Sequence, residues 1–321
     1  MDKATKNAYW QLHIAVLIFG FTAILGKLIS SDHFTLVWHR MWLAALCFFL
    51  IPNFYKLLKV ISFKNFLMLI GIGCLVAIHW LTFYGSIKIG KSASLTLGCF
   101  GLTSCFTSIL EPLIFKKKFN TIEILLGLLA LVGITIIAYY SPSESKEGGN
   151  FSLAIIVGVF STFVAALFST INSGLANKID TKVISFSELL GGFLFLNVIL
   201  LFAPLFSQYQ TVLPLHSFQV LPITNHPSFI NSPYADFIWI AILAIVCTNI
   251  AFVMNLNAMK KVSAFTANLA INLEPIYGII LAAIILKEHE MLNIQFYIGT
   301  SIILSSVILH AIIKNYGKQH Q

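Results

Sequence analysis

The stretch KKVSAFTANLAINLEPIYGIILAAIILKE, residues 260–288, decides the fold class. Lysines stand at both ends of an apolar run from 263 to 286, and one carboxylate, Glu274, stands near its middle, just before Pro275. The hydrocarbon core of a bilayer is about 30 Å thick and needs about 20 apolar residues per helix. The run therefore predicts a transmembrane helix that carries an acid at depth.

Similar apolar runs occupy most of the remaining chain. Of its 321 residues, 58% are hydrophobic and only 10% are charged, whereas a soluble domain carries about 25% charged residues. This composition excludes a soluble protein and a disordered one. We predict an all-α integral membrane protein with ten transmembrane helices, near 11–29, 34–55, 65–87, 92–115, 121–140, 151–176, 183–206, 236–257, 263–286 and 292–313.

The basic residues indicate the orientation of these helices. Fourteen of the 20 Lys and Arg residues fall in the two tails and the loops on one side, and four fall in the loops on the other. Cytoplasmic loops carry the excess of Lys and Arg. We therefore predict a multi-pass protein of the cytoplasmic (inner) membrane with both termini in the cytoplasm. The long uncharged loop 207–235 then lies outside, as a connector or as a lid.

The two halves of the chain match each other. GKLISSDHFTLVWHR, residues 26–40, overlies GLANKIDTKVISFSE, residues 174–188, and farther along Ser92-Ala93 overlies Ser263-Ala264 at a shift of 171. At that same shift Lys116 overlies Lys287. We predict two units, 1–147 and 148–321, joined near the polar linker SPSESKEGGN. Because each unit has an odd number of helices, five, they form a 5+5 inverted-topology repeat.

The ninth run, with Ser263-Ala264, Pro275 and Glu288, resembles the second-half signature of the EamA type in the drug/metabolite transporter superfamily. Ten helices, a five-plus-five duplication and an arginine in the second helix, here Arg40, extend the resemblance over the whole chain. The resemblance implies alternating-access transport of a small polar metabolite, such as an amino acid, often as export. One departure is that Ser104 stands where the repeat would place a proline of the first half.

Three polar residues are candidates for a substrate site. A charged side chain at the centre of a bilayer costs roughly 2.5 to 3.5 kcal/mol, so each one needs a reason. Helix rise places Arg40, His79 and Glu274 at similar depths in the outer half of the membrane. Arg40 could then hold a substrate carboxylate through two hydrogen bonds. The alternative is an Arg40–Glu274 ion pair that only fixes packing.

Glu111 and Glu188 lie toward the inner side of the membrane and are candidates for proton coupling. Two neighbouring carboxylates can share one proton, as a proton-coupled carrier requires. The alternative is that both reach water at the interface, near cytoplasmic lysines such as Lys116.

For each of the remaining candidates, an ordinary structural role is an alternative to a functional one. Pro112 and Pro275 are predicted hinges or static kinks. The amides predicted to contact substrate, or else to join neighbouring helices, are Asn249, Asn268 and Asn272. Trp38 and Tyr84 are weaker candidates for the cavity wall, because aromatic belts are common near membrane surfaces.

The chain carries no G-x-S-x-G, H-E-x-x-H or similar catalytic motif. We therefore predict a carrier and not an enzyme, without cofactor or metal. Its partners are a small-molecule substrate and membrane lipid, with no nucleic acid, as a monomer or a homodimer. A lipid-handling carrier and, after it, a membrane-embedded enzyme are the alternatives.

Overall fold

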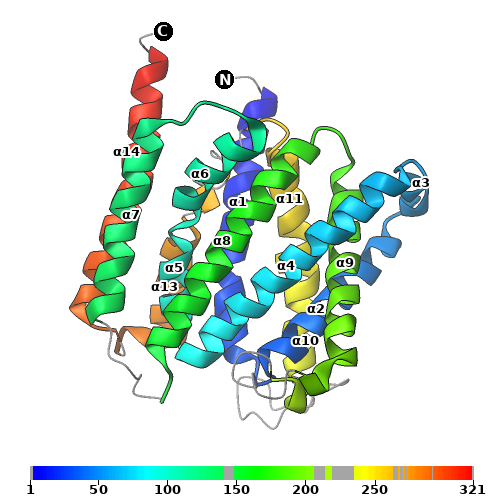
Figure 1. The fold of residues 1–321 in the computed structure, drawn as a ribbon, viewed down its shortest axis with the longest axis horizontal. Coiled ribbons are helices and arrows are strands. Elements are labelled where there is room, and N and C mark those ends of the chain that lie inside the picture. Colours follow the sequence, from blue (N-terminus) through cyan, green and yellow to red (C-terminus); the bar gives the residue numbers. More distant parts are fainter. Residues whose placement is uncertain are drawn as a thin grey trace.

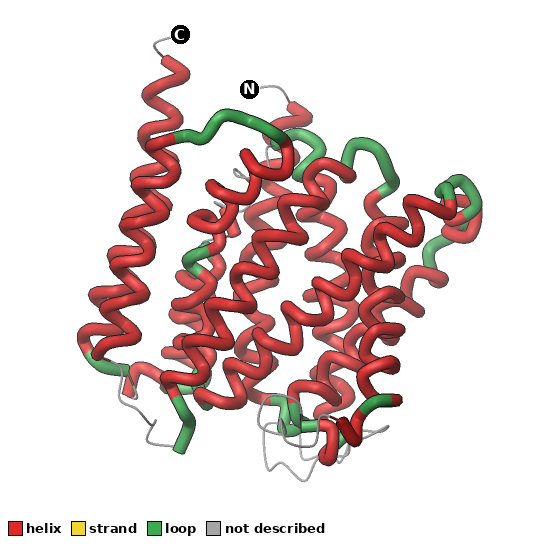
Figure 2. Tube along the Cα trace, viewed as in Figure 1, coloured by secondary structure: helices red, strands yellow, loops and turns green. Residues whose placement is uncertain are grey.

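The computed structural model describes residues 3–140, 148–205, 214–218, 235–262, 267, 270–271, 273–290 and 292–319. Within these residues the protein is all-helical (Figures 1 and 2). The longest helices are α1 (Lys3–Leu28), α4 (Phe63–Gly90), α7 (Thr121–Tyr140), α8 (Phe151–Leu175), α9 (Thr181–Leu201) and α14 (Ile294–Gln319). The shorter ones are α2 (His33–Cys47), α3 (Phe54–Leu58), α5 (Ala93–Phe100), α6 (Thr103–Phe115), α10 (Ala235–Ala244), α11 (Ala251–Ala258) and α13 (Glu274–Ile285).

Eight helical stretches in the described residues are long and apolar enough to cross a membrane. Two shorter apolar helices, Glu274–Ile285 and Ile294–Ser306, follow them. The multi-pass, all-helical class is therefore confirmed, and the count of ten spans stays a prediction. Of the predicted range 263–286, the structure describes α13 and, before it, the helical residues Ala267, Ala270 and Ile271.

Polar side chains start several of these helices at the predicted breaks. Asp32 accepts a hydrogen bond from the Thr35 amide before α2, and Asn150 accepts one from the Leu153 amide before α8. Ser62 and Ser92 cap α4 and α5 in the same way. Each cap satisfies a backbone N–H that the first turn of a helix leaves without a partner.

Two spans are irregular in their middle. The fourth is broken between α5 and α6 at Gly101 and Leu102. The eighth contains a π-helical stretch, Ile245–Ile250, between α10 and α11. Such wide turns occur often at functional sites, and this one faces Arg40.

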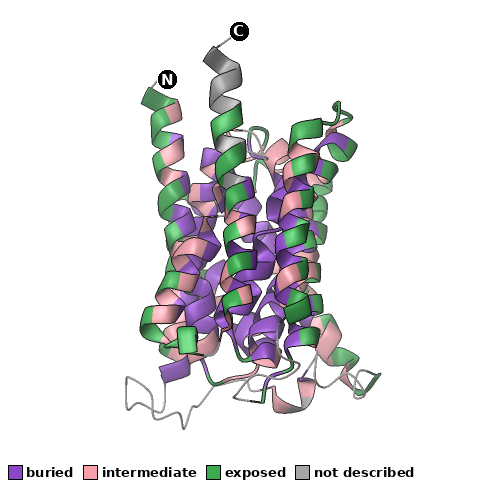
Figure 3. Ribbon diagram, turned by 90° about the vertical axis from the view of Figure 1, so that its left-hand side faces the viewer, coloured by how far each residue is buried: buried purple, intermediate pink, exposed green. Residues whose placement is uncertain are grey.

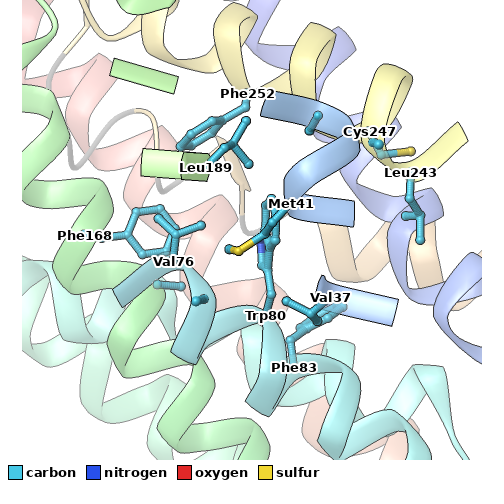
Figure 4. Packing of buried hydrophobic residues seen from close by; sticks show 14 of the residues in the cluster. Val37, Met41, Val76, Trp80, Phe83, Phe168, Leu189, Leu243, Cys247 and Phe252 are labelled. Carbon is cyan, nitrogen blue, oxygen red and sulfur yellow. The ribbon is translucent and has the colours of Figure 1, made fainter. Parts of the chain in front are cut away.

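The helices surround a core to which both halves of the chain contribute. α4 packs along α8 and α9, and α1 packs along α11 and α13. This core includes Trp80 and Phe83 of α4, Met41 of α2 and Phe168 of α8 (Figure 4). α7 and α14 pack against each other at one side of the bundle (Figure 1).

The outer surface of the bundle is apolar. Buried residues fill its interior and exposed ones line its outside (Figure 3). On α7 the outward residues Leu125, Leu128 and Val132 are exposed. An apolar exterior of this size is unfavourable in water and suits contact with lipid.

The two ends of the bundle differ in what they carry. Both termini lie at one end, which is the upper end in Figure 1. α1 starts at that end, whereas α8 starts at the opposite one (Figure 1). The first helices of the two halves therefore run in opposite directions.

Candidate functional site: a central polar cavity

A cavity lies between the two halves, with a volume of about 700 Å³ that includes space open to the surroundings. Helices from both halves line it. Its wall consists of aromatic and apolar side chains interrupted by a few polar ones: Phe19, Thr22, Arg40, Val76, His79, Trp80, Phe83, Phe100, Thr103, Ala165, Phe168, Ser169, Cys247, Phe252, Asn255, Ile271 and Glu274. An apolar wall with a few convergent polar groups is typical of a small-molecule site.

Arg40 is the cation of this cavity and is only 3% exposed. Its Nε donates to Thr248 Oγ1 at 2.7 Å, and one terminal nitrogen donates to the Tyr84 hydroxyl at 2.6 Å. The other terminal nitrogen lies 3.4 Å from the Cys247 carbonyl oxygen, which it contacts as a donor. The guanidinium carbon lies 3.7 Å from the centre of the Trp80 ring. These contacts fix the plane of the guanidinium before any ligand binds.

The π-helical stretch supplies the anchors of Arg40. Thr248 and Cys247 both belong to it, and Thr248 Oγ1 in turn donates to the Leu243 carbonyl at 2.8 Å. Sequence reasoning missed both anchors, because a threonine and a backbone carbonyl inside an apolar run carry no pattern that marks them. The irregular turn is visible only in the fold.

Glu274 is the anion of the same cavity and is 4% exposed. Glu274 is the first residue of α13, and Pro275 follows it in the first turn. Arg40 lines the same cavity. Within the described residues, however, no ion pair joins the two side chains. The packing-only alternative, a direct Arg40–Glu274 bridge, is not present in this conformation.

His79 also lines the cavity, on α4. Its Nδ1 lies 2.9 Å from Ser161 Oγ and 3.1 Å from the Ser161 carbonyl oxygen. Its ring lies among Phe83, Phe100 and Phe168. The structure thus brings together Arg40, His79 and Glu274 at one cavity.

The other predicted wall residues lie behind or beside the cavity. Tyr84 supports Arg40 from behind and does not belong to the wall. Trp38 points toward α9, where its Nε1 lies 3.4 Å from Asn197 Oδ1, and its ring meets Phe193. Asn249 donates to the Ala44 carbonyl at 3.0 Å. This hydrogen bond joins two helices, which is the predicted alternative to contact with substrate. Asn268 and Asn272 lie outside the described residues.

The two inner carboxylates have separate partners. Glu111 on α6 forms an ion pair with Lys117 at 2.8 Å. Glu188 on α9 accepts a hydrogen bond from Asn172 Nδ2 at 3.2 Å and is fully buried. Neither belongs to the cavity wall.

The two prolines differ in their place in the helix. Pro112 lies inside α6, where it removes a backbone hydrogen bond. Pro275 lies in the first turn of α13, where its missing N–H leaves no helical bond unmade. Pro275 therefore costs α13 no backbone hydrogen bond.

A bundle of apolar helices around a buried cavity that both halves line, with an apolar wall and a few charged and polar groups, is typical of a membrane transporter. The sequence matches the model of the EamA-like transporter family over residues 7–139 and 152–312. The chain belongs to the EamA-like transporter family. The two matched stretches lie on either side of the polar linker, and the family is one of transporters, not of enzymes.

Two further proteins are similar over the whole length. An uncharacterized transporter of Clostridium kluyveri is 25% identical over 313 residues, which cover 94% of this chain and 93% of the relative. A protein of known crystal structure, 12% identical, superposes with a TM-score of 0.63 over 96% of this chain and 98% of the other. At that identity the likeness shows the fold alone.

Proposed function

We propose that this protein is a secondary transporter that moves an amino acid or a related small polar metabolite across the cytoplasmic membrane, in the direction of export, with the central cavity as its substrate site. One observation carries the proposal. Arg40 and Glu274 are both buried in one cavity, yet they do not pair with each other. Two opposite buried charges that stay apart are costly unless a ligand comes between them.

The chemistry of the wall favours a zwitterion. Arginine has five N–H donors, and contacts within the described protein use three of those on Arg40. The remaining donors suit a carboxylate of the substrate, and Glu274 suits its ammonium group. The rings of Trp80, Phe100 and Phe168 provide an apolar surface for a side chain and a face for a cation.

Backbone features support an inverted repeat around this cavity. α6 begins at Thr103 and α13 at Glu274, which are 171 residues apart, the shift already found in the sequence. Lys116 and Lys287, separated by the same shift, follow these helices with φ of 53° and 54°. Two such units in opposite orientation are the arrangement by which known carriers alternate access to a central site.

The placement of the termini supports the proposed orientation. Both lie at one end of the bundle (Figure 1), and the loops at 56–64, 116–118 and 178–182, which are rich in lysine, adjoin the same end. The excess of basic residues favours a cytoplasmic location for that end. The direction of transport, export, is an expectation from the resemblance of the sequence.

A flux assay tests the proposal. Purified protein is reconstituted in liposomes and screened for counterflow of labelled amino acids and related metabolites. We expect counterflow for a subset of zwitterions, its loss in Arg40→Ala, and its retention in Lys59→Ala, a change at an exposed cation outside the cavity. Absence of flux for every metabolite, or movement of a lipid instead, would overturn it.

A further inference from the structure

Glu188 is the most isolated carboxylate among the described residues. Its side chain is fully buried on α9, and its backbone lies so close to Gly73 of α4 that a Cβ there would come within 2.1 Å of the Glu188 carbonyl oxygen. This contact holds the residue firmly between α4 and α8. In its hydrogen bond with Asn172, the carboxylate uses only Oε2.

Two acceptors of this same pair are left over. Glu188 Oε1 and Asn172 Oδ1 are both buried without a hydrogen-bond partner in the described structure. Buried polar atoms without partners are rare and call for a reason. A proton on Glu188 Oε1 turns this atom into a donor. The acceptor without a partner, Asn172 Oδ1, belongs to the same amide group that already donates to Glu188 Oε2.

We infer that Glu188 and Asn172 form a carboxylic acid–amide pair that binds one proton, and that this proton is the ion coupled to transport. The inference rests on the proposed function. One proton satisfies both orphaned atoms, because the amide N–H donates to Oε2 while the Oε1 hydroxyl donates to the amide oxygen. The bond formed is the O–H of the acid, and the bond broken is that of the water or hydronium that delivers the proton.

Among the described residues of the packed elements, no charged group forms an ion pair with Glu188. α8, which carries Asn172, has no ionisable residue, and neither has α11. Arg40 of α2 is committed to Thr248 and Tyr84, and His79 of α4 to Ser161. The remaining titratable groups on the packed elements α2, α4 and α9 are His33, His39, Cys47, Lys64, Cys74, Lys88 and Lys182. Burial of an unpaired carboxylate in this setting favours its neutral form.

The pair adjoins the cavity by way of α8 and α11. Asn172 stands three residues after Ser169, so both lie on one face of α8, and Ser169 lines the cavity. Asn255 of α11 also lines it, and Asn255 Oδ1 is a further buried acceptor without a partner in the described residues. Through Ser169, about one helical turn from Asn172, the pair has a polar neighbour that lines the cavity.

The experiment uses reconstituted protein with a pH dye trapped inside the liposomes. We expect that the transported zwitterion moves with protons in the wild type, and that a pH gradient drives its accumulation. Glu188→Gln keeps counterflow without a gradient but loses both proton movement and accumulation. Glu123→Gln, at a partly exposed carboxylate at the start of α7, retains both.

A second readout does not depend on transport. Infrared spectroscopy of the purified protein detects the C=O stretch of a protonated carboxyl group, and we expect a band that is absent in Glu188→Gln and shifted in Asn172→Leu. Absence of counterflow in the wild type refutes the proposed function. Counterflow that a sodium gradient drives, or a Glu188→Gln variant that still accumulates substrate with pH, refutes the proton pair alone.

Discussion

Two regions of the bundle contain buried carboxylates, and the two regions differ in the number of hydrogen bonds that these carboxylates accept. At the end away from the termini, Asp236 and Glu288 receive a full set of hydrogen bonds from the opposite half of the chain. By contrast, Glu188 has one hydrogen bond in the described structure, and Glu274 faces the cavity. All four side chains are almost fully buried, so burial alone does not separate them.

The satisfied pair joins the two halves. Asp236 Oδ1 accepts from the Ser30 amide at 2.9 Å, and Oδ2 accepts from the Ser31 amide at 2.8 Å and from both serine hydroxyls. Glu288 accepts from the amides of Ala93 and Ser94 and from the Ser92 hydroxyl. Carboxylates with this many donors stabilise a conformation, whereas Glu188 and Glu274 keep unused capacity for a proton or a ligand.

Asp236→Ala gives the largest expected loss of stability. It removes the hydrogen bonds that the buried carboxylate accepts from Ser30, which is exposed, and from Ser31, which is partly exposed. Each lost hydrogen bond costs about 0.5 to 1.5 kcal/mol. We expect the free energy of unfolding in detergent to fall by about 2 to 5 kcal/mol.

The matched control is Asp180→Ala. Asp180 accepts a single backbone bond, from the Lys182 amide, so its loss costs about 1 kcal/mol. Equal effects of the two substitutions would contradict the structural role assigned to Asp236.

Glu288→Ala comes second. Ala93 and Ser94 lie in the first turn of α5, and they lose their acceptor when the carboxylate is removed. We expect a loss of about 1 to 3 kcal/mol, measured by thermal unfolding in the same detergent. Glu290→Ala, at an exposed neighbour, serves as the control and should leave the melting temperature nearly unchanged. If Glu290→Ala lowered the melting temperature as much as Glu288→Ala, the stabilising role assigned to the hydrogen bonds between Glu288 and α5 would be wrong.

The sequence predicted much of the fold because bilayer thickness acts on chain length directly. Apolar runs such as 121–140 coincide with α7 to the residue, since nothing but a helix satisfies the backbone in lipid. The break within 92–115 was not predicted, because Gly101 and Leu102 lie in a run whose hydropathy stays high. Hydropathy indicates which segments lie in the membrane, but it does not show where the helix within such a segment is interrupted.

The candidate site was predicted only in part, for a similar reason. Charges stand out in an apolar run, so Arg40, His79 and Glu274 could be found as cavity residues from their rarity and depth. Thr248, Phe100 and Phe168 are ordinary residues in membrane helices, and only their packing gives them a role. The repeat offered one unused signal, because Thr103 is the counterpart of Glu274 at the shift of 171 and also lines the cavity.

Glu274→Gln should separate binding from stability. The amide retains the size of the side chain and removes a buried charge that forms no ion pair in the described structure. We expect the free energy of unfolding to change by less than about 1 kcal/mol, while the KM for a zwitterion rises strongly because its ammonium group loses an anion. Parallel measurement of unfolding and counterflow checks this. A large loss of stability would mean that Glu274, like Asp236, stabilises the fold and does not serve mainly to bind substrate.

Glu188→Leu has the smallest expected effect on stability and sharpens the comparison most. Replacement of both partners of a buried polar or ionic pair by apolar groups of similar volume is often neutral or stabilising. Glu188→Leu alone deletes one orphaned acceptor but also the partner of Asn172 Nδ2, so the two effects nearly cancel. Glu188→Leu with Asn172→Leu removes both groups, and we expect the double variant to be at least as stable as the wild type in chemical unfolding. If the double variant unfolds as readily as Asp236→Ala, Glu188 stabilises the fold. The proposed difference between carboxylates with a full set of hydrogen bonds and those without would then be wrong for Glu188.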